Sequence, residues 1–277
     1  MKFTKMHGAG NDYIYVDCFN ENVENPEELS RKLSHRHFGV GADGLVLIKP
    51  SFVADCSMNI YNSDGTEAQM CGNAIRCVAK YIYDNKKKRD KIKIDTLSGI
   101  KVVEIHSESG IAVGGTVNMG KPIFNGRQIP TRYGMSVVKD QIINIDNNDY
   151  KITCVGMGNP HCIVFCSDID KLELNKIGLL FEHHEMFPER INTEFVESID
   201  ENHLKMRVWE RGSGETLACG TGACAVAVSA IVNGLCQRNK EIKIEALGGT
   251  LTVKWHEDNN VYLTGEAVEI FKGEIKM

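Results

Sequence analysis

The sequence of 277 residues lacks the features of membrane and exported proteins. No apolar run reaches the roughly 18 residues that a membrane-spanning helix requires. The first residues, Met1–Lys5, do not begin the continuous apolar stretch of a signal peptide. We therefore expect a cytoplasmic protein with no membrane partner.

The sequence also lacks the usual patterns of metal, phosphate and dinucleotide sites. None of its ten cysteines forms a Cys-x-x-Cys pair, and neither a Walker phosphate loop nor a dinucleotide-binding glycine pattern is present. Cys162 and Cys166 lie in an apolar run, where four strand steps would separate them by roughly 13 Å, too far to share one ion. We expect no metal, no cofactor and no disulfide framework, with most cysteines buried as small apolar side chains.

An excess of positive charge is missing as well. The net charge is −5 at pH 7, and the one basic run, Lys86–Arg89, is expected to be a solvated turn after a helix. This balance argues against a general nucleic-acid partner. With 42% hydrophobic residues, the chain can bury a sizeable core in one large domain or two ordinary ones.

The most informative pattern present is an internal repeat with an offset close to 148 residues. Three local matches carry it, at Gly10 and Gly158, at Cys71 and Cys219, and at Leu97 and Leu247. The first two pairs are 148 residues apart and the third is 150 residues apart. Because the matches keep their order and nearly their spacing, the sequence predicts two copies of one structural unit.

Each copy combines strand patterns with one apolar helix. Helices are expected over 72–84 and 220–233, and the second is apolar on every side, which is typical of a buried helix. We therefore predict an α+β fold of two pseudo-symmetric domains, each a curved, mainly antiparallel sheet wrapped around a central helix. The expected domains are residues 1–118 with 264–277, and residues 119–263. Strands are expected near 13–17, 58–61, 91–95, 101–106, 152–155, 162–166 and 204–210.

Cys71 and Cys219 each stand at the expected start of a helix and are followed by glycine. The first N–H groups of a helix have no partner within it, and the helix dipole adds positive potential there. A thiol in such a place is expected to have a lowered pKa and to form a thiolate readily. The glycine lets a ligand approach the backbone closely. Two equivalent cysteines in a repeat are therefore candidates for chemistry.

Inverting a stereocentre by proton transfer needs a base on one face of the carbon and an acid on the other. If the two domains are related by a pseudo-twofold axis, a carboxylate would bind between the helix N-termini with one thiol on each side. Backbone N–H groups aimed at that carboxylate would stabilise the developing negative charge. The sequence thus predicts an epimerase in which Cys71 and Cys219 exchange the roles of base and acid, without metal or pyridoxal cofactor.

Several segments together resemble the diaminopimelate epimerase family, and the resemblance covers nearly the whole chain. They are His7–Asp12, Asn62–Gly65, Met70–Cys77, Gly158–His161, Glu210–Gly212 and Ala218–Gly222. The resemblance implies interconversion of LL- and meso-diaminopimelate, in lysine and peptidoglycan-precursor synthesis. It also implies the two-domain fold of that family, a small amino-acid substrate and a homodimer.

The resemblance also implies roles for individual residues. Cys71 and Cys219 match the catalytic pair, with His161 assisting the first thiol and Glu210 the second. The positions that match substrate contacts are Asn11, Asn73 and Asn159, the backbone anchors Gly72, Gly220 and Thr221, and the distal-end residues Asn62, Asn192 and Arg211. Gly44 stands where some members have a glutamine near the site, which puts that one contact in doubt.

Other interpretations of the same residues remain open. A two-cysteine racemase acting on proline or hydroxyproline would share the fold, but its substrate lacks the distal carboxylate and amine that Arg211, Asn62 and Asn192 would bind. A redox thiol protein would instead form a disulfide between the two cysteines. An isomerase with a carboxylate base is disfavoured because both thiols are present. Taken singly, the asparagines also suit turns, His161 suits a core position, and Glu210 with Arg211 suits a surface ion pair.

Overall fold

The structure, a computed structural model, describes residues 1–276. The chain divides into two compact units. Unit 1 comprises Met1–Asn118 and the C-terminal segment that begins at Thr264, and unit 2 comprises Met119–Leu263.

Unit 1 is built mainly from short strands and two helices. Its elements are β1 (Lys2–Gly8), β2 (Asn11–Asp17), α1 (Pro26–Ser34), β3 (Gly44–Lys49), β4 (Cys56–Asn62), β5 (Glu67–Ala68), α2 (Gly72–Asn85), β6 (Lys91–Thr96), β7 (Gly99–Glu108), β8 (Ile111–Gly120) and the C-terminal β18 (Val268–Glu274). Strand β18 pairs antiparallel with β1, so the end of the chain belongs to the sheet that its beginning opens.

Unit 2 repeats this order. Its elements are β9 (Gln141–Ile145), β10 (Asn148–Gly156), β11 (Pro160–Phe165), the short 3-10 helix η1 (Ile169–Lys171), α3 (Leu174–Glu182), β12 (Asn192–Asp200), β13 (His203–Glu210), β14 (Gly214–Thr216), α4 (Gly220–Val232), β15 (Ile242–Ala246), β16 (Gly249–Trp255) and β17 (Val261–Glu266). Strands β8 and β17 each cross from one unit into the other along the chain.

The two units pair their strands in the same order and sense. In unit 1, β1–β2, β3–β4 and β6–β7 are antiparallel, whereas β2–β3 and β4–β6 are parallel. In unit 2, β10–β11, β12–β13 and β15–β16 are antiparallel, whereas β11–β12 and β13–β15 are parallel. The register repeats as well, because Tyr13 pairs with Gly44 and His161 pairs with Asn192, 148 residues further along for each partner. The internal repeat is confirmed.

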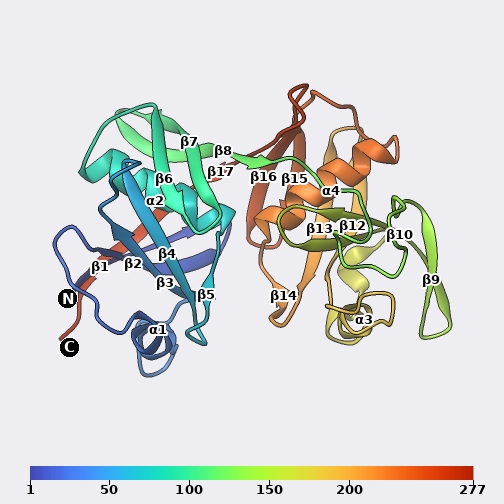
Figure 1. The fold of residues 1–277 in the computed structure, drawn as a ribbon, viewed down its shortest axis with the longest axis horizontal. Coiled ribbons are helices and arrows are strands. Elements are labelled where there is room, and N and C mark those ends of the chain that lie inside the picture. The colour runs from blue at the N-terminus through green and yellow to red at the C-terminus, as the bar shows by residue number, and fades with distance from the viewer. Residues whose placement is uncertain (277) are drawn as a thin grey trace. The chain divides into compact units, whose positions relative to one another are not determined.

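A buried helix occupies the middle of each unit (Figure 1). Helix α2 packs against β1, β2, β4, β6 and β7, and α4 packs against β10, β11, β12, β15 and β16. Helix α4 is buried without interruption from Gly222 to Ala230, as expected for a helix with no polar face. The predicted arrangement, a mainly antiparallel sheet around a central helix, is confirmed in both units.

The opposite face of each sheet carries a second helix that the sequence pattern did not predict. Helix α1 packs against β3 and β4, and α3 packs against β9, β12, β13 and β14. Successive strand residues point to opposite faces, so alternate positions separate the two layers. Cys162, Val164 and Phe195 join the cluster that contains Phe181 of α3. His161 and Glu194, which directly precede Cys162 and Phe195 in the chain, therefore belong to the α4 face.

Candidate active site

Cys71 is the N-cap residue of α2. Its backbone is extended (φ −137°, ψ 121°), and its Sγ accepts the backbone N–H of Ala74 at 3.5 Å. Its carbonyl oxygen accepts the N–H of Ile75. A side chain that accepts here satisfies one of the donors that a helix leaves open at its start. The prediction that Cys71 lies at a helix N-terminus is confirmed.

Asn11 lies beside the Cys71 thiol, and Asp43 fixes the orientation of Asn11. The thiol donates to Asn11 Oδ1 across 3.3 Å, and Asn11 Nδ2 donates to Asp43 Oδ2 at 2.8 Å. Asn11 therefore presents its amide oxygen to the sulfur. The Arg36 guanidinium lies 3.3 Å from the other oxygen of Asp43. Burial, followed by the neighbouring Asp12 carboxylate, raises the pKa of Asp43.

A buried arginine holds the first turn of α2. Arg76 is fully buried, and its Nη1 and Nη2 donate to Gly72 O and Asn73 Oδ1, both at 2.8 Å. Its Nε donates to Glu266 O at 3.3 Å. The guanidinium thus fixes the two positions that follow Cys71, and Asn73 itself is buried.

Asn62 ends β4 opposite Gly44, the first residue of β3. The Asn62 amide donates to Thr66 Oγ1 at 3.0 Å within the turn that leads to β5. A Cβ added to Gly44 would lie 2.1 Å from Tyr61 O and 2.9 Å from the Tyr13 ring. The backbone therefore leaves no room for a side chain at this position.

Cys219 is the N-cap residue of α4, as predicted. Its backbone (φ −117°, ψ 114°) resembles that of Cys71, and its Sγ accepts the N–H of Gly222 at 3.4 Å. The same sulfur lies 3.4 Å from Thr221 Oγ1. Cys219 is buried, whereas Cys71 is half-buried.

The expectation that the helix start lowers the thiol pKa is wrong for Cys219. Burial raises the pKa of Cys219 well above its ordinary value, and the Glu210 and Glu194 carboxylates raise it further. Hydrogen bonds from Thr221 and Gly222 lower it by less. Loss of water disfavours the thiolate and the two carboxylates repel it, so these effects exceed that of the helix N-terminus. Cys219 is a thiol at neutral pH.

Glu210, the last residue of β13, is a half-buried acid beside Cys219. Thr216 Oγ1 donates to Glu210 Oε1 at 2.5 Å. Burial raises the pKa of Glu210, and the Glu194 carboxylate adds to the increase, while hydrogen bonds from Thr216 and Cys219 oppose it. A carboxyl group with a raised pKa is suited to accept a proton and return it near neutral pH. Cys219 and Glu210 therefore form a thiol–carboxylate pair.

His161 lies on β11, fully buried between two polar side chains. Its Nδ1 is 2.7 Å from Glu194 Oε1, and its Nε2 is 2.9 Å from Asn159 Oδ1. Glu194 is also fully buried, on the neighbouring strand β12. The histidine is therefore held at both ring nitrogens.

Asn192 and Arg211 lie close to this histidine in unit 2. Asn192 Nδ2 donates to Pro160 O at 2.9 Å, and Asn192 Oδ1 accepts the backbone N–H of Arg211 at 2.8 Å. A cavity of about 260 Å³ opens beside them. Its lining includes Gln128, Gly158, Asn159, Pro160, Glu189 and Arg211. Two predicted substrate contacts, Asn159 and Arg211, thus line one cavity.

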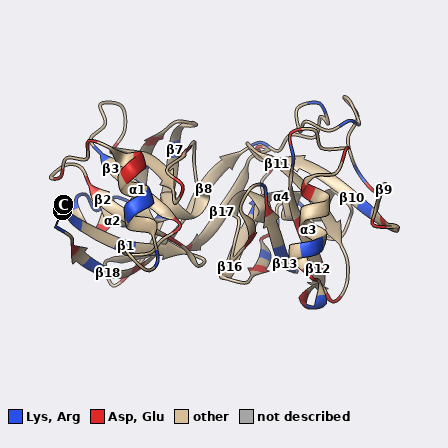
Figure 2. Ribbon diagram, turned by 90° about the horizontal axis from the view of Figure 1, so that it is seen from below, with Lys and Arg blue, Asp and Glu red and all other residues tan. Residues whose placement is uncertain are grey.

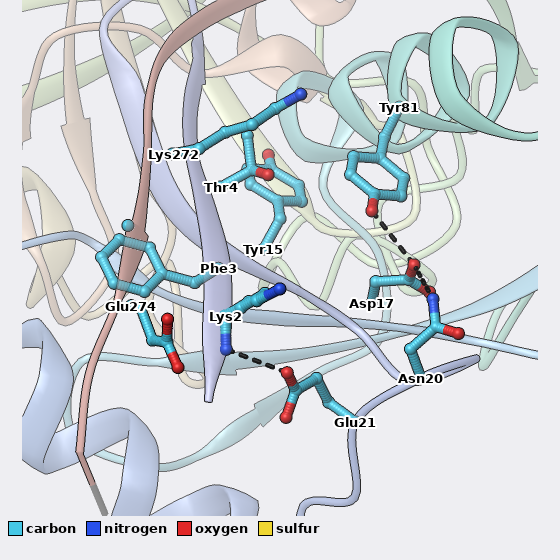
Figure 3. A pocket seen from close by; sticks show the side chains of 11 residues that line it. Lys2, Phe3, Thr4, Tyr15, Asp17, Asn20, Glu21, Tyr81, Lys272 and Glu274 are labelled. Atoms are coloured by element: carbon cyan, nitrogen blue, oxygen red, sulfur yellow. Dashed lines mark hydrogen bonds between the residues drawn. The ribbon is translucent and has the colours of Figure 1, made fainter.

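A larger cavity of about 490 Å³ lies in unit 1, at β1 and β18 (Figure 3). Asp17 accepts hydrogen bonds from Tyr81 and Asn20 there, and Glu21 accepts one from the Lys2 backbone. None of the predicted site residues lines this cavity. Size alone therefore does not locate the candidate site.

Three residues of the site were not identified from the sequence: Asp43, Arg76 and Glu194. A signal existed for Glu194, which is the one charged residue in the segment 191–196. Asp43 likewise stands directly before the apolar strand β3. Charged residues in or next to buried strands mark groups that have a partner or a function.

Within residues 1–276, no group of three His, Cys, Asp or Glu side chains is arranged to hold a metal ion. None of the helices in this range has the length and apolar character needed to cross a membrane. Lys, Arg, Asp and Glu are interspersed over both units (Figure 2).

The model of the diaminopimelate epimerase family matches residues 3–125 and 153–270. A diaminopimelate epimerase of Acetivibrio thermocellus is 53% identical over 279 residues, covering 100% of this chain and 99% of the relative. One of Methanococcus maripaludis strain S2 is 55% identical over 278 residues, covering 99% of each. Among solved structures, a probable proline racemase from Agrobacterium radiobacter K84 has a TM-score of 0.73 at 14% identity, covering 100% of this chain and 93% of that one. This last similarity shows the fold alone.

Proposed function

Because this chain belongs to the diaminopimelate epimerase family, we propose that it interconverts LL- and meso-diaminopimelate by proton transfer between two thiols. The observation that carries the proposal is the presence of two N-cap cysteines, Cys71 and Cys219, at equivalent positions of the repeat. The two units then act as epimerase halves, and each contributes one thiol.

The reaction proceeds through a carbanion at the α-carbon. The Cys71 thiolate takes the α-proton, and the electron pair of the C–H bond moves onto the carbon and its carboxylate. The Cys219 thiol gives its proton to the opposite face and becomes the thiolate. Backbone N–H groups at Gly72, Asn73, Gly220 and Thr221 stabilise the charge on the carboxylate.

Glu210 serves the reverse direction. Cys219 is a thiol at neutral pH, so it is ready to act as the acid without a preceding proton transfer. To act as the base it must first lose that proton, and the neighbouring Glu210 carboxylate is the acceptor. His161 assists the other half of the cycle, in which the Cys71 thiol must give up its proton.

The distal end of the substrate binds near Arg211. The 260 Å³ cavity that Arg211 and Asn159 line is suited to a second amino-acid head group. Arg211→Ala is therefore expected to raise KM for diaminopimelate more than it lowers kcat. Unchanged kinetics would remove Arg211 from substrate binding.

One assay tests the reaction and separates it from its alternatives. In deuterated water under reducing conditions, without added pyridoxal phosphate or metal, LL-diaminopimelate should yield the meso form with deuterium at the inverted carbon. Inversion of proline or hydroxyproline but not of diaminopimelate would favour the racemase alternative. Reduced protein that exchanges no α-proton of any of these substrates would favour a redox thiol protein.

We propose, on the family resemblance, that the enzyme works as a cytoplasmic homodimer in lysine and peptidoglycan-precursor synthesis. Analytical ultracentrifugation at micromolar concentration tests the assembly. A monomer under assay conditions would contradict it.

A further inference from the structure

Glu194 and His161 form a side-chain pair that solvent does not reach. Glu194 Oε1 lies 2.7 Å from His161 Nδ1, and neither side chain has any exposed surface. The two residues lie on the neighbouring parallel strands β12 and β11, and both belong to the face that packs against α4. The contact is therefore built into the sheet.

The first turn of α4 leaves space for this carboxylate. A Cβ added to Gly222 would lie 2.5 Å from Glu194 Oε1, closer than real Cβ contacts allow. At the equivalent positions of unit 1, 148 residues earlier, stand Val46 and Ala74. Unit 2 therefore has a carboxylate and a glycine where unit 1 has two apolar residues. It also has His161 where unit 1 has Tyr13.

Packing of the core does not explain why a carboxylate, that of Glu194, stands at this buried position. Glu194 Oε2 is buried and has no hydrogen-bond partner among residues 1–276. A buried polar atom without a partner destabilises a fold, whereas the valine of unit 1 at the same place has no such atom. Buried titratable groups of this kind concentrate at functional sites.

We propose that Glu194 is a positioning residue that fixes the ring orientation and the hydrogen placement of His161. The proposal rests on the proposed function only for the consequence in turnover, because the contact itself is independent of any substrate.

The chemistry follows from the hydrogen-bonding capacity of each group. A carboxylate can only accept, so the hydrogen of the Glu194 contact must sit on His161 Nδ1. The Asn159 amide oxygen that faces Nε2 can likewise only accept, so Nε2 donates to it when it carries a hydrogen, and Nε2 is the nitrogen at which a proton is lost or regained. Nε2 faces Asn159, and Asn159 also lines the 260 Å³ cavity. Glu194 therefore directs the proton exchange of His161 toward the side where substrate is proposed to bind.

The direct test is ¹⁵N NMR of the histidines in the full-length protein, with the His161 signals identified by their loss in His161→Gln. Wild type should show the Nδ1-protonated form whenever the ring is neutral. Glu194→Gln replaces the obligate acceptor by an amide that can accept or donate, so both neutral forms should appear. Glu197→Gln, the same change on the opposite face of β12, should leave the spectrum unchanged.

Turnover provides a second measurement. Glu194→Gln should lower kcat for diaminopimelate by about 10- to 100-fold, the size of effect known for removal of the hydrogen-bond partners that orient metal-binding histidines. KM should change by less than about 3-fold, since Glu194 touches no substrate. In a His161→Gln background the same substitution should have almost no further effect, because coupled residues are not additive.

A second variant covers the case in which Glu194→Gln does not fold. The double variant Glu194→Val with Gly222→Ala installs the apolar pair of unit 1 and should fold while losing the same turnover. An unchanged His161 spectrum with kcat within about 2-fold of wild type in a folded variant would overturn the proposal. If wild type itself does not invert diaminopimelate, the proposed function fails, and the NMR result still decides whether Glu194 positions His161.

Discussion

The two units bury charged side chains of opposite sign. In unit 1 the buried charged residues are Lys5, Arg76 and Lys80, and in unit 2 they are Glu182 and Glu194, together with His161. The backbone around the two N-cap cysteines is nevertheless the same in strand order, pairing sense and register. The repeat therefore supplies two equivalent helix N-termini, and the side chains make them different.

The difference can be followed position by position at the 148-residue offset. The pairs are Tyr13 and His161, Val46 and Glu194, Asn62 and Glu210, Ala74 and Gly222, and Arg76 and Cys224. The two titratable groups proposed to assist the thiols, His161 and Glu210, both lie in unit 2. The Cys71 thiol instead donates to an amide, that of Asn11.

This asymmetry suits an inversion better than two identical thiols would. At the start of each turnover one sulfur must carry a proton and the other must not. Two identical environments would hold both in the same state. Burial and the nearby carboxylates raise the pKa of Cys219 and favour its thiol form, and the proposed proton acceptor Glu210 allows that proton to leave when Cys219 acts as the base.

The largest expected effect comes from removing either thiol. Cys71→Ala and Cys219→Ala should each lower inversion by about 10³-fold or more, because general acid–base partners contribute 10²–10⁴-fold each. Each variant keeps one thiol and should still exchange the α-proton of the stereoisomer whose proton that thiol faces. Proton NMR of LL- and meso-diaminopimelate in deuterated water measures both quantities.

The matched control for these variants is Cys166→Ala, a half-buried cysteine outside both helix starts. It should retain near-full turnover. If both N-cap variants exchanged the α-proton of the same stereoisomer, the two thiols would not serve opposite faces of the carbon. The differences between the two units would then not explain an inversion.

Glu210→Gln gives unit 2 the amide chemistry that unit 1 carries at Asn62. We expect kcat/KM to fall about 10²-fold, equally in both directions, because the equilibrium constant fixes their ratio. Activity of the wild type should decline as the pH falls through the raised pKa of Glu210, since only the carboxylate accepts a proton. That acidic limb should be missing in the variant. A pH–rate profile that keeps the limb would assign it to another group.

Asp43→Ala tests unit 1, in which the Cys71 thiol contacts the Asn11 amide. Asp43 accepts from Asn11 Nδ2 and from the backbone N–H of Asp12, so its loss should free the Asn11 amide to rotate. We expect kcat to fall about 10-fold. Asp43→Asn retains an acceptor oxygen and should remain within about 3-fold of wild type. If both variants lost activity equally, the negative charge rather than the amide orientation would be what unit 1 requires.

The sequence predicted the repeat and both central helices because each rests on a strong local signal. Helix α4 is apolar on all sides, and α2 repeats apolar residues at helical spacing, so both were placed to within one residue. Helix α1 was missed although Pro26 opens it and Glu27 and Glu28 stand in its first turn. Both α1 and α3 are only nine residues long, so their amphipathic patterns are too short to stand out from the strand patterns around them.

The protonation state of the site was less predictable than its position. The N-cap location of Cys219 follows from local sequence, but its pKa is raised by burial and then by Glu210 and Glu194, which lie at the end of β13 and on β12. Strand pairing brings these carboxylates together, and no local pattern contains that information. The family resemblance implies roles for Glu210 and His161. The sequence marks Glu194 only as a charge in an apolar segment, and its contact with the buried His161 is seen in the structure alone.

The smallest expected effect concerns stability. The pKa of Glu210 in the folded protein is raised above its ordinary value of 4.5, so the folded state binds this proton more tightly than the unfolded chain does. The resulting stabilisation is complete below the unfolded pKa and is lost as the pH rises through the folded pKa. At pH 8 the ionised Glu210 therefore destabilises the fold, and Glu210→Gln should raise Tm by about 2–4 °C, which corresponds to roughly 1 kcal/mol. Near pH 4 the two proteins should unfold at the same temperature.

Thermal unfolding followed by circular dichroism at both pH values measures the difference, with the exposed Glu257→Gln as control. A variant that is less stable than wild type at pH 8 would show that the hydrogen bond from Thr216 outweighs burial of the charge.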